Sequence, residues 1–170
     1  MSLPPDPAVI PPFTSEDLRA ALGQFTTGVT IVTTHTPQGH LVGLTANSFN
    51  SVSLSPPLVL WSLANKSTSL PGFISSAHYA INVLAADQRL LAERFATRGI
   101  DRFEGVNWRP GMTGAPVIQG AVAVFECAHR HHYDEGDHVI FVGRVEHCTR
   151  RVGAAPLVFQ GGRFFTDLNW

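Results

Sequence analysis

Apolar and polar positions alternate along most of the chain in a way that predicts a mainly extended structure with a few short helices. Near the N-terminus, Thr14–Asp17 has the composition of a helix start. Hydroxyl side chains cap the free backbone N–H groups there, and acidic side chains suit the positive end of the helix dipole. Four apolar residues then recur at helical spacing, which predicts one short helix: Leu18, Ala21, Leu22 and Phe25.

After Gly28 the pattern changes to runs of β-branched and apolar residues separated by turn residues. Residues 29–36 and 41–46 read as the two strands of a hairpin around the turn at Pro37–His40. The other elements expected in this half are strands at 58–63 and 79–84 and helical turns near 67–76 and 87–95.

The second half of the chain is more plainly β. Residues 121–131 and 138–147 are two long extended runs, joined by a hairpin loop at 132–137. A further hairpin is predicted where Gly161 and Gly162 separate two short runs, at 156–160 and 163–166. With about seven strands, two or three short helices and short connections, the pattern favours an antiparallel barrel over a parallel α/β sheet.

Length and composition agree with one folded domain. The 170 residues have a mass of 18.4 kDa, and 44% of them are apolar. We expect a flexible proline-rich leader at 1–12 and a single domain at 13–170. Only 15% of the residues are charged, against about 25% in a typical soluble domain. A sparsely charged surface predicts that part of it is covered in an oligomer.

The charge balance excludes one class of partner. Twelve Lys and Arg against 13 Asp and Glu leave a formal charge of −1, so no basic field exists to hold a nucleic acid. No apolar run approaches the roughly 20 residues of a membrane span, and the leader has neither the basic start nor the apolar stretch of a signal peptide. Two cysteines, Cys127 and Cys148, predict reduced thiols in a cytoplasmic protein.

Two polar stretches are candidates for ligand binding. Residues 45–53 are dense in small hydroxyl and amide side chains, which satisfy carbonyls and ring nitrogens and allow close approach to the backbone. The alternative is an ordinary polar loop. Residues 65–69 hold the only lysine, Lys66, among hydroxyls, a combination that binds phosphate or simply caps a helix. The usual nucleotide and hydrolase fingerprints are absent from the sequence.

Five histidines between residues 129 and 147, near both cysteines, raise the alternative of a metal site. Their spacing does not match zinc ligand patterns, and strand alternation puts His129 and His131 on one face and His132 on the other. His138 differs because it follows Gly136–Asp137 and shares strand parity with two apolar residues, which predicts a side chain turned toward the interior, either as a ligand-binding or as a structural histidine.

Taken in order, these segments resemble the flavin reductase-like domain of two-component flavin-dependent monooxygenases, from about residue 20 to residue 165. Each motif alone is weak, and seven in register are specific. The matching segments are Phe25–Thr33, Gly43–Phe49 running into Ser51–Ser53, Pro56–Leu60, Ala80–Leu84, Leu91–Phe95, Gly136–His138 with Val142–Val145, and Gly162–Phe164.

The resemblance implies a split β-barrel of the FMN-binding type, which is a six-stranded antiparallel Greek key with short flanking helices. It implies a homodimer with the flavin in a groove near the dimer interface. The implied reaction is hydride transfer from NADH or NADPH to FMN or FAD, after which reduced flavin diffuses to a separate monooxygenase. The cofactors carry this chemistry, and the protein holds the nicotinamide C4 against the flavin N5.

The resemblance also implies roles for particular residues. His138 matches the family histidine beside the nicotinamide, and no residue acts as a nucleophile. Backbone N–H groups at Asn47 and Ser48 would stabilise negative charge on reduced flavin. The residues implied to bind the flavin are Thr45, Ala46, Asn47, Ser48, Phe49 and Ser51 at the ring and ribityl chain, Lys66 and Ser67 at the phosphate, Asn82 and Arg94 near the tail, and Phe164 beside the stacked rings.

Three alternatives remain at this point. Related split barrels oxidise pyridoxamine phosphate or reduce other acceptors with tightly bound FMN. A flavin carrier or sensor without catalytic activity would use the same groove. A metal-binding protein would use the histidine cluster.

Overall fold

The computed structural model describes residues 12–166, which fold into a mainly β structure. The expected leader falls outside the described residues except for Pro12. The helices within 12–166 are α1 (Ser15–Leu22), α2 (Leu70–Ser75) and α3 (Arg89–Ala96), with one 3-10 turn, η1 (Ala86–Gln88). The strands there are β1 (Thr27–Gly28), β2 (Thr30–His35), β3 (Leu41–Ala46), β4 (Asn50–Leu54), β5 (Pro57–Ala64), β6 (His78–Val83), β7 (Trp108–Pro110), β8 (Pro116–Ile118), β9 (Ala123–Glu135), β10 (His138–Arg150), β11 (Val158–Gln160) and β12 (Arg163–Phe165).

Every helix and hairpin that the sequence predicted is confirmed, but three differences stand out. β9 and β10 run through most of the expected loop at 132–137, so that only Gly136 and Asp137 remain as the turn. β4 occupies part of the stretch interpreted as a loop, because an edge strand that is exposed on both faces shows no apolar alternation. The short hairpin β7–β8 was missed as well.

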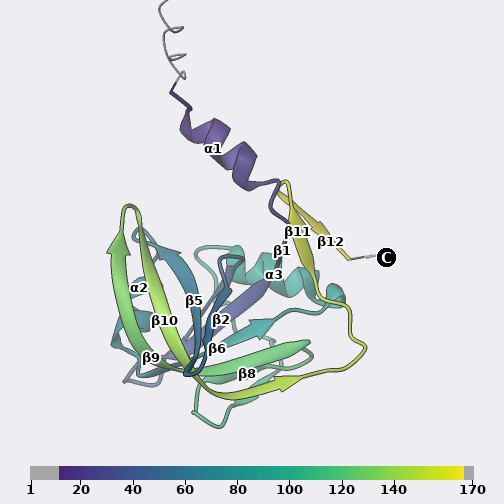
Figure 1. Cartoon of the computed structure of the whole chain (residues 1–170). Helices are drawn as coiled ribbons and strands as arrows, with labels where there is room; N and C mark the ends of the chain where they lie inside the picture. The colour runs from purple at the N-terminus through teal and green to yellow at the C-terminus, as the bar shows by residue number, and fades with distance from the viewer. Residues whose placement is uncertain (1–11, 167–170) are drawn as a thin grey trace, which may run out of the picture.

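One large antiparallel sheet forms the body of the molecule (Figure 1). Its strand order is β3-β2-β6-β9-β10-β5-β4. A small sheet, β1-β11-β12, lies beside it and carries the C-terminal hairpin, and β7 and β8 form a separate pair. The small sheet and α3 lie near the same end of β3, where they enclose the groove described below.

The large sheet has to curl, because its two edges are consecutive in the chain. β3 and β4 lie at opposite ends of the strand order, yet only residues 47–49 connect them. Seven strands laid flat would separate the edges by roughly 29 Å, whereas so short a connection reaches about 15 Å at most. β3 and β4 do not pair with each other in the described sheet, so the curled sheet stays open along this line.

Aromatic side chains fill the inside of the curl. Trp61 on β5 stacks on Phe141 of β10, with ring centroids 4.7 Å apart, and Phe73 of α2 meets the Trp61 ring edge-on. All three side chains are fully buried. Burial of rings this large is a major stabilising contribution to a sheet of this size.

A second apolar cluster holds α3 against β3. Phe95 of α3 lies over Gly43, where an added Cβ would come within 2.6 Å of the Phe95 ring. Gly43 is therefore needed for this close approach, and not for its backbone angles. The contact fixes the helix whose last residue, Ala96, borders the groove.

Helix α1 projects away from the body (Figure 1). Its start is closed by a capping box, in which the Asp17 backbone N–H donates to the Thr14 hydroxyl and the Asp17 carboxylate accepts from the Thr14 backbone N–H. No residue of the helix is buried. In the part of the chain that the structure describes, no helix is long and apolar enough to cross a membrane.

Candidate functional site

A groove of about 240 Å³ opens between the end of β3 and the hairpin β11–β12. Its lining is mostly apolar, with polar groups at one end. Four of the residues predicted to bind the flavin meet here, together with three that were not predicted. The lining residues are Val29, Thr45, Ala46, Asn47, Ala96, Phe159 and Phe164.

The hairpin places two aromatic rings on the groove. Gly161 and Gly162 have φ values of 55° and 79°, the left-handed conformations that a two-residue hairpin turn requires. This turn sets the register in which Phe159 pairs with Phe164, with ring centroids 5.2 Å apart. The guanidinium of Arg89 lies 5.9 Å from the Phe164 ring centroid, a distance at which cation–π attraction acts.

The opposite wall comes from the end of β3. The Thr45 hydroxyl donates a 2.6 Å hydrogen bond to the Ala92 carbonyl of α3, which fastens this wall to the helix. Asn47 is exposed, and its amide makes no hydrogen bond to another described residue. Within the described structure, the Asn47 amide is therefore available to a ligand.

Ser48 ties the connector at residues 47–49 to β5. Its hydroxyl accepts from the Ser62 backbone N–H at 2.9 Å and donates to the Ser62 carbonyl at 3.1 Å. The hydroxyl is thus occupied by the protein, which leaves the backbone as the part of Ser48 that can meet a flavin. Phe49 packs on Phe125, with ring centroids 5.3 Å apart, and Ser51 lies exposed on the edge strand β4.

A second set of predicted residues meets at the end of β5. The Asn65 backbone N–H donates to the Asp137 carbonyl at 2.9 Å, and the Asn65 amide donates to the Gly136 carbonyl at 3.3 Å. These bonds hold the segment with Lys66 and Ser67 against the turn before His138. The structure therefore brings the predicted phosphate-binding residues next to the predicted catalytic histidine.

The expectation that His138 points into the interior is wrong. In β10 the buried residues are Val139, Phe141 and Gly143, and the His138 side chain is 46% exposed on the other face. Strand parity was read correctly, but the apolar partners Ile140 and Val142 are themselves on the outer face. His138 Nδ1 lies 2.6 Å from Asp137 Oδ1. This hydrogen bond and the histidine charge lower the pKa of Asp137 below its ordinary value.

Two predicted flavin ligands have other tasks in the structure. Asn82 is fully buried, where its amide donates to the Ile31 carbonyl and accepts from the Ile118 N–H. Arg94 donates to the carbonyls of Asp101 and Arg102 and so holds the loop after α3. Neither residue lines the groove. Both side chains are engaged by the protein, so we leave them out of the proposed site.

The histidine cluster differs from its expected arrangement. A β-bulge at Arg130 interrupts strand alternation, so that His129 and His132 share a face, with His132 Nδ1 3.2 Å from His129 Nε2. His131 points to the opposite face. Burial lowers the pKa of His129, which the hydrogen bond to the Ser76 carbonyl partly offsets.

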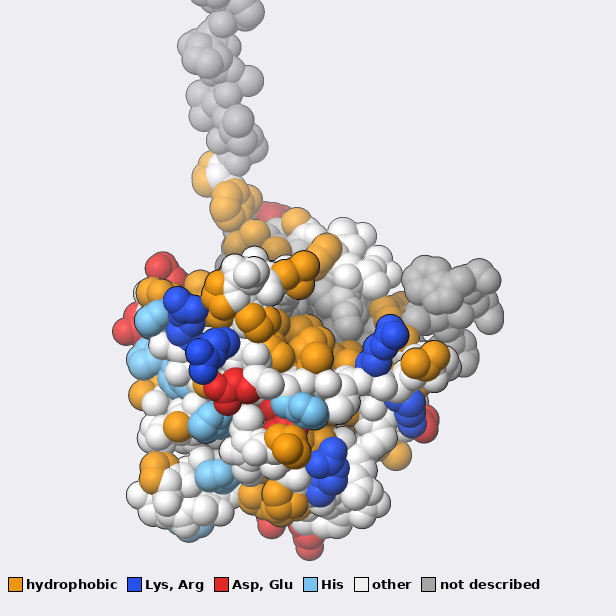
Figure 2. All heavy atoms as spheres, turned by 60° about the horizontal axis from the view of Figure 1, so that its bottom comes forward, with side chains coloured by type: hydrophobic (Ala, Val, Ile, Leu, Met, Phe, Trp, Pro, Cys, Tyr) orange, Lys and Arg blue, Asp and Glu red, His pale blue; other side chains and the backbone are white. Residues whose placement is uncertain are grey.

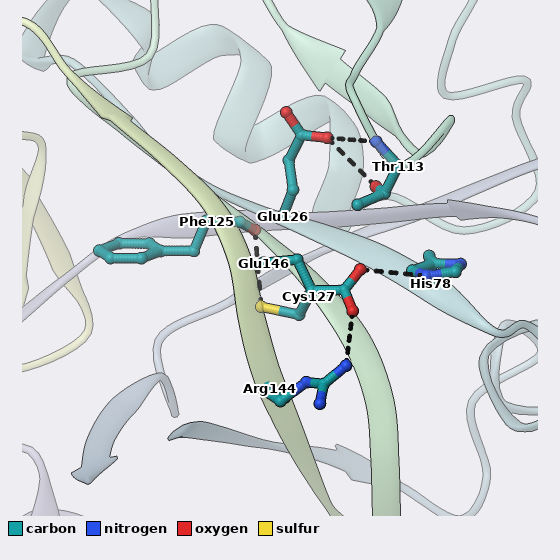
Figure 3. Close-up of polar contacts among 7 residues, drawn as sticks. All are labelled: His78, Thr113, Phe125, Glu126, Cys127, Arg144 and Glu146. Carbon is teal, nitrogen blue, oxygen red and sulfur yellow. Dashed lines mark hydrogen bonds and ion pairs between the residues drawn. The ribbon is translucent and has the colours of Figure 1, made fainter. Parts of the chain in front are cut away.

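Nearby acidic and sulfur groups have partners of their own, as Figure 3 shows. Glu126 binds the backbone N–H and hydroxyl of Thr113, whereas Glu146 pairs with His78 at 3.3 Å and with Arg144 at 2.9 Å. Among residues 12–166, no three His, Cys, Asp or Glu side chains are arranged to hold a metal ion.

Three groove residues were missed by the sequence analysis. Phe159 faces Phe164 across the predicted hairpin, so the hairpin register could have identified it. Val29 directly precedes β2, and Ala96 is the last residue of α3. Only tertiary packing brings the two residues to the groove. Small apolar residues of this kind carry no signal in a single sequence.

Comparison with known proteins gives a consistent result. Residues 22–166 match the family described as "Flavin reductase like domain". FMN reductase (NADH) SmoA of Agrobacterium fabrum is 51% identical over 150 residues, covering 88% of this chain and 84% of the relative. The reductase component of the flavin-dependent trigonelline monooxygenase of Acinetobacter baylyi is 43% identical over 150 residues, or 88% of this chain, which spans about half (48%) of that relative.

A solved structure is similar as well. It is the Streptomyces globisporus C-1027 NADH:FAD oxidoreductase SgcE6 in complex with NAD and FAD fragments. It is 42% identical to this chain with a TM-score of 0.85, and the match covers 91% of this chain and 93% of the other.

Proposed function

Because this chain belongs to the flavin reductase-like domain family, we propose that it transfers hydride from NADH or NADPH to FMN or FAD. One observation carries the proposal: the match over residues 22–166 includes a groove in which Thr45, Ala46, Asn47 and Phe164 meet. Relatives that act on NADH with FMN and with FAD support both flavins as substrates.

The groove suits a flat aromatic ring with polar edges. Phe159, Phe164 and Ala96 offer apolar surface to a ring face, whereas Thr45 and Asn47 would offer partners to polar ring atoms. The flavin and the nicotinamide supply the redox chemistry when both are bound. The protein contributes position, since a fixed approach of two reactants is itself a large part of the rate enhancement.

The remaining residues are assigned by their chemistry. We assign the backbone N–H groups of Asn47 and Ser48 to the carbonyl edge of the ring, where reduced flavin gains negative charge. Lys66 and Ser67 would hold the flavin phosphate, since both are at the end of β5 with no ion pair to the lysine among the described residues. His138, fixed by Asp137, would meet the nicotinamide.

The partner is a separate monooxygenase that receives reduced flavin. The A. baylyi relative is the reductase component of such a system, which supports this role. The proposal does not require a stable complex, because the groove is open to solvent on one side and a reduced flavin can leave by diffusion.

We further propose a split-barrel homodimer. The curled, open antiparallel sheet supports the split barrel. The homodimer is supported by α1, whose Leu18 and Leu22 are 46% and 63% exposed. Figure 2 shows hydrophobic side chains along the projecting helix and on the body next to it. An eight-residue helix of this kind is marginal in water unless its apolar face is covered.

The test is a direct assay. Purified protein is mixed with NADH and FMN, FAD or riboflavin, and the nicotinamide absorbance band is followed, with NADPH in parallel. We expect oxidation of NADH that depends on both the protein and the flavin. Absence of oxidation with either nicotinamide would contradict the proposal. Oxidation of pyridoxamine phosphate without NADH would instead favour the related oxidases.

A further inference from the structure

A second hollow, of about 300 Å³, lies at the start of β3, at the opposite end of that strand from the groove. Three parts of the chain form it: the first half of β3, the segment before α2, and the loop after α3. We call it the β3 hollow. Its lining residues are Leu41, Val42, Gly43, Thr68, Ser69, Gly99, Ile100, Asp101, Arg102 and Phe103.

Arg102 is the chief cation of the β3 hollow. Its Nη1 donates to the Gly43 carbonyl at 2.7 Å and to the Ser69 hydroxyl at 3.2 Å, and its Nε donates to the Thr97 carbonyl at 2.8 Å. These three bonds use neutral acceptors, and no carboxylate pairs with Arg102 among the described residues. The side chain is thus held in place with its charge uncompensated.

A second arginine adds to the positive potential. Burial and the charge of Arg98 lower the pKa of Arg102, so the two guanidinium groups are close enough to repel each other. Asp101 is the carboxylate on the lining, and its Oδ1 accepts from the Phe103 N–H of its own loop. An anion in the hollow would relieve the repulsion between the arginines.

The hollow also continues the segment proposed to hold the flavin phosphate. Lys66 and Ser67 are followed directly by the lining residues Thr68 and Ser69, and the Ser69 N–H donates to the Ser67 hydroxyl at 3.3 Å. A phosphate at Lys66 therefore has hydroxyl groups and then a guanidinium further along the same path. Leu41, Val42 and Ile100 give apolar surface at the rim.

We propose that the β3 hollow binds the adenosine diphosphate moiety of a dinucleotide, with the pyrophosphate at Arg102 and the adenine at the apolar rim. The inference rests on the proposed function. Arg102 Nη2 makes no hydrogen bond to another described residue, so its N–H groups can donate to phosphate oxygens, and a volume near 300 Å³ is at the lower end of that of ligand pockets. FAD and NADH share this moiety. Continuity with Lys66 and Ser67 favours FAD.

The experiment compares nucleotides with and without the moiety. Equilibrium binding of FAD and FMN is measured by flavin fluorescence for the full chain and for Arg102→Met. Because charge-assisted bonds to phosphate are lost, we expect FAD affinity to fall by about tenfold or more, while FMN affinity changes by about twofold or less. In parallel, the KM for NADH is compared with that for reduced nicotinamide mononucleotide.

A second variant avoids the structural bonds of Arg102. Ile100 is 46% exposed at the rim, so Ile100→Glu adds a negative charge without removing a framework contact. We expect the same selective loss of FAD affinity, growing at low salt. Val152→Glu, at a site 84% exposed and outside the hollow, is the matched control and should leave both flavins unaffected.

The outcomes separate the two proposals. A rise in KM for NADH alone, with no rise for reduced nicotinamide mononucleotide, would support binding of the adenosine diphosphate moiety in the β3 hollow. It would assign that moiety to NADH and not to FAD. Equal changes in FAD and FMN affinity, together with an unchanged KM for NADH, would overturn the proposed role of the β3 hollow, even if the protein reduces flavin normally. Failure to oxidise NADH with any flavin would instead contradict the function itself.

Discussion

At the scale of single residues, His138 combines an exposed imidazole with a carboxylate that fixes its orientation. The 2.6 Å bond to Asp137 orients Nδ1 and leaves Nε2 for a ligand. A residue placed in this way can act on a bound nicotinamide without contributing to the core, so its removal should affect kinetics and not folding.

We expect His138→Ala to raise the KM for NADH or to lower kcat while flavin affinity stays nearly unchanged. Steady-state kinetics and flavin binding measure the two effects separately. His131→Ala is a suitable control, because His131 is equally exposed on the neighbouring strand. Unchanged kinetics in the His138 variant would remove it from the site.

Asn82 should behave in the opposite way. Asn82→Ala would remove the buried bonds of this amide to the Ile31 carbonyl, the Thr33 hydroxyl and the Ile118 N–H, and would leave the Ile118 N–H without its partner. Unpaired buried groups cost about 1–3 kcal/mol each, so we expect the free energy of unfolding to fall by about 2–4 kcal/mol. Denaturant titration measures it, with the exposed Asn50→Ala as control. A stable variant with weakened flavin binding would restore Asn82 as a ligand.

The two thiols should differ in reactivity. Burial raises the pKa of Cys127 to about 12, with Glu146 and Glu126 adding to the effect, so the reactive thiolate is scarce at pH 8. Cys148 is exposed. We expect a thiol reagent at pH 8 to modify Cys148 alone in the native protein and both cysteines in denaturant. Rapid native labelling of Cys148→Ser would contradict the buried position of Cys127.

The sequence could place residues in the groove only where a local pattern marks their position. Thr45, Asn47 and Phe164 line one groove, and each lies at the end of a recognisable strand or next to a recognisable turn. Asn82 could not, because a polar residue in a strand gives the same signal whether its partners are a ligand or distant backbone groups. His129 and His132 were misassigned because a one-residue bulge reverses strand parity and leaves no mark in the sequence.

At the scale of elements, α1 is the helix with the least contact to its own chain. It is joined to the body by a 2.8 Å bond from the Gly161 N–H to the Gly23 carbonyl, next to a hollow that shares Asn47 and Phe159 with the groove. A second copy seated on α1 would therefore lie beside the flavin.

We expect the double variant Leu18→Asp, Leu22→Asp to dissociate the proposed homodimer, because charges on the helix face proposed to be covered would oppose its burial. Light scattering at a range of concentrations gives the mass. Ala20→Asp, which lies on the opposite side of the helix, is the control. A wild-type monomer at working concentrations would rule out the dimer.

Element boundaries were predictable where turn residues mark them, as at Gly161–Gly162 and Gly136–Asp137. The edge strand β4 and the pair β7–β8 were not, since strands with little burial lack the alternation that identifies a strand. β9 and β10 extend beyond their predicted ends for the same reason. Their outer residues, such as Tyr133, are exposed and show no apolar alternation that would predict a strand.

At the scale of the whole molecule, the mainly β class and the antiparallel arrangement followed from short connections between strands. The strand order did not, because it depends on pairings such as β6 with β9 that join residues far apart in the chain. Charged side chains of both signs are scattered over the face shown in Figure 2, in agreement with the near-zero net charge.

The connector at residues 47–49 has a thermodynamic consequence. It spans the open seam of the curled sheet, is tied to β5 through Ser48, and ends one wall of the groove at Asn47. A ligand held by Asn47 therefore also stabilises the connector across the opening between β3 and β4. Because the ligand binds the folded protein and not the unfolded chain, its binding adds to the free energy of unfolding. Saturating flavin should raise the melting temperature. Ser48→Ala should lower the melting temperature and weaken flavin affinity together. With one glycine inserted into the connector, changes in melting temperature and in flavin affinity should no longer accompany each other.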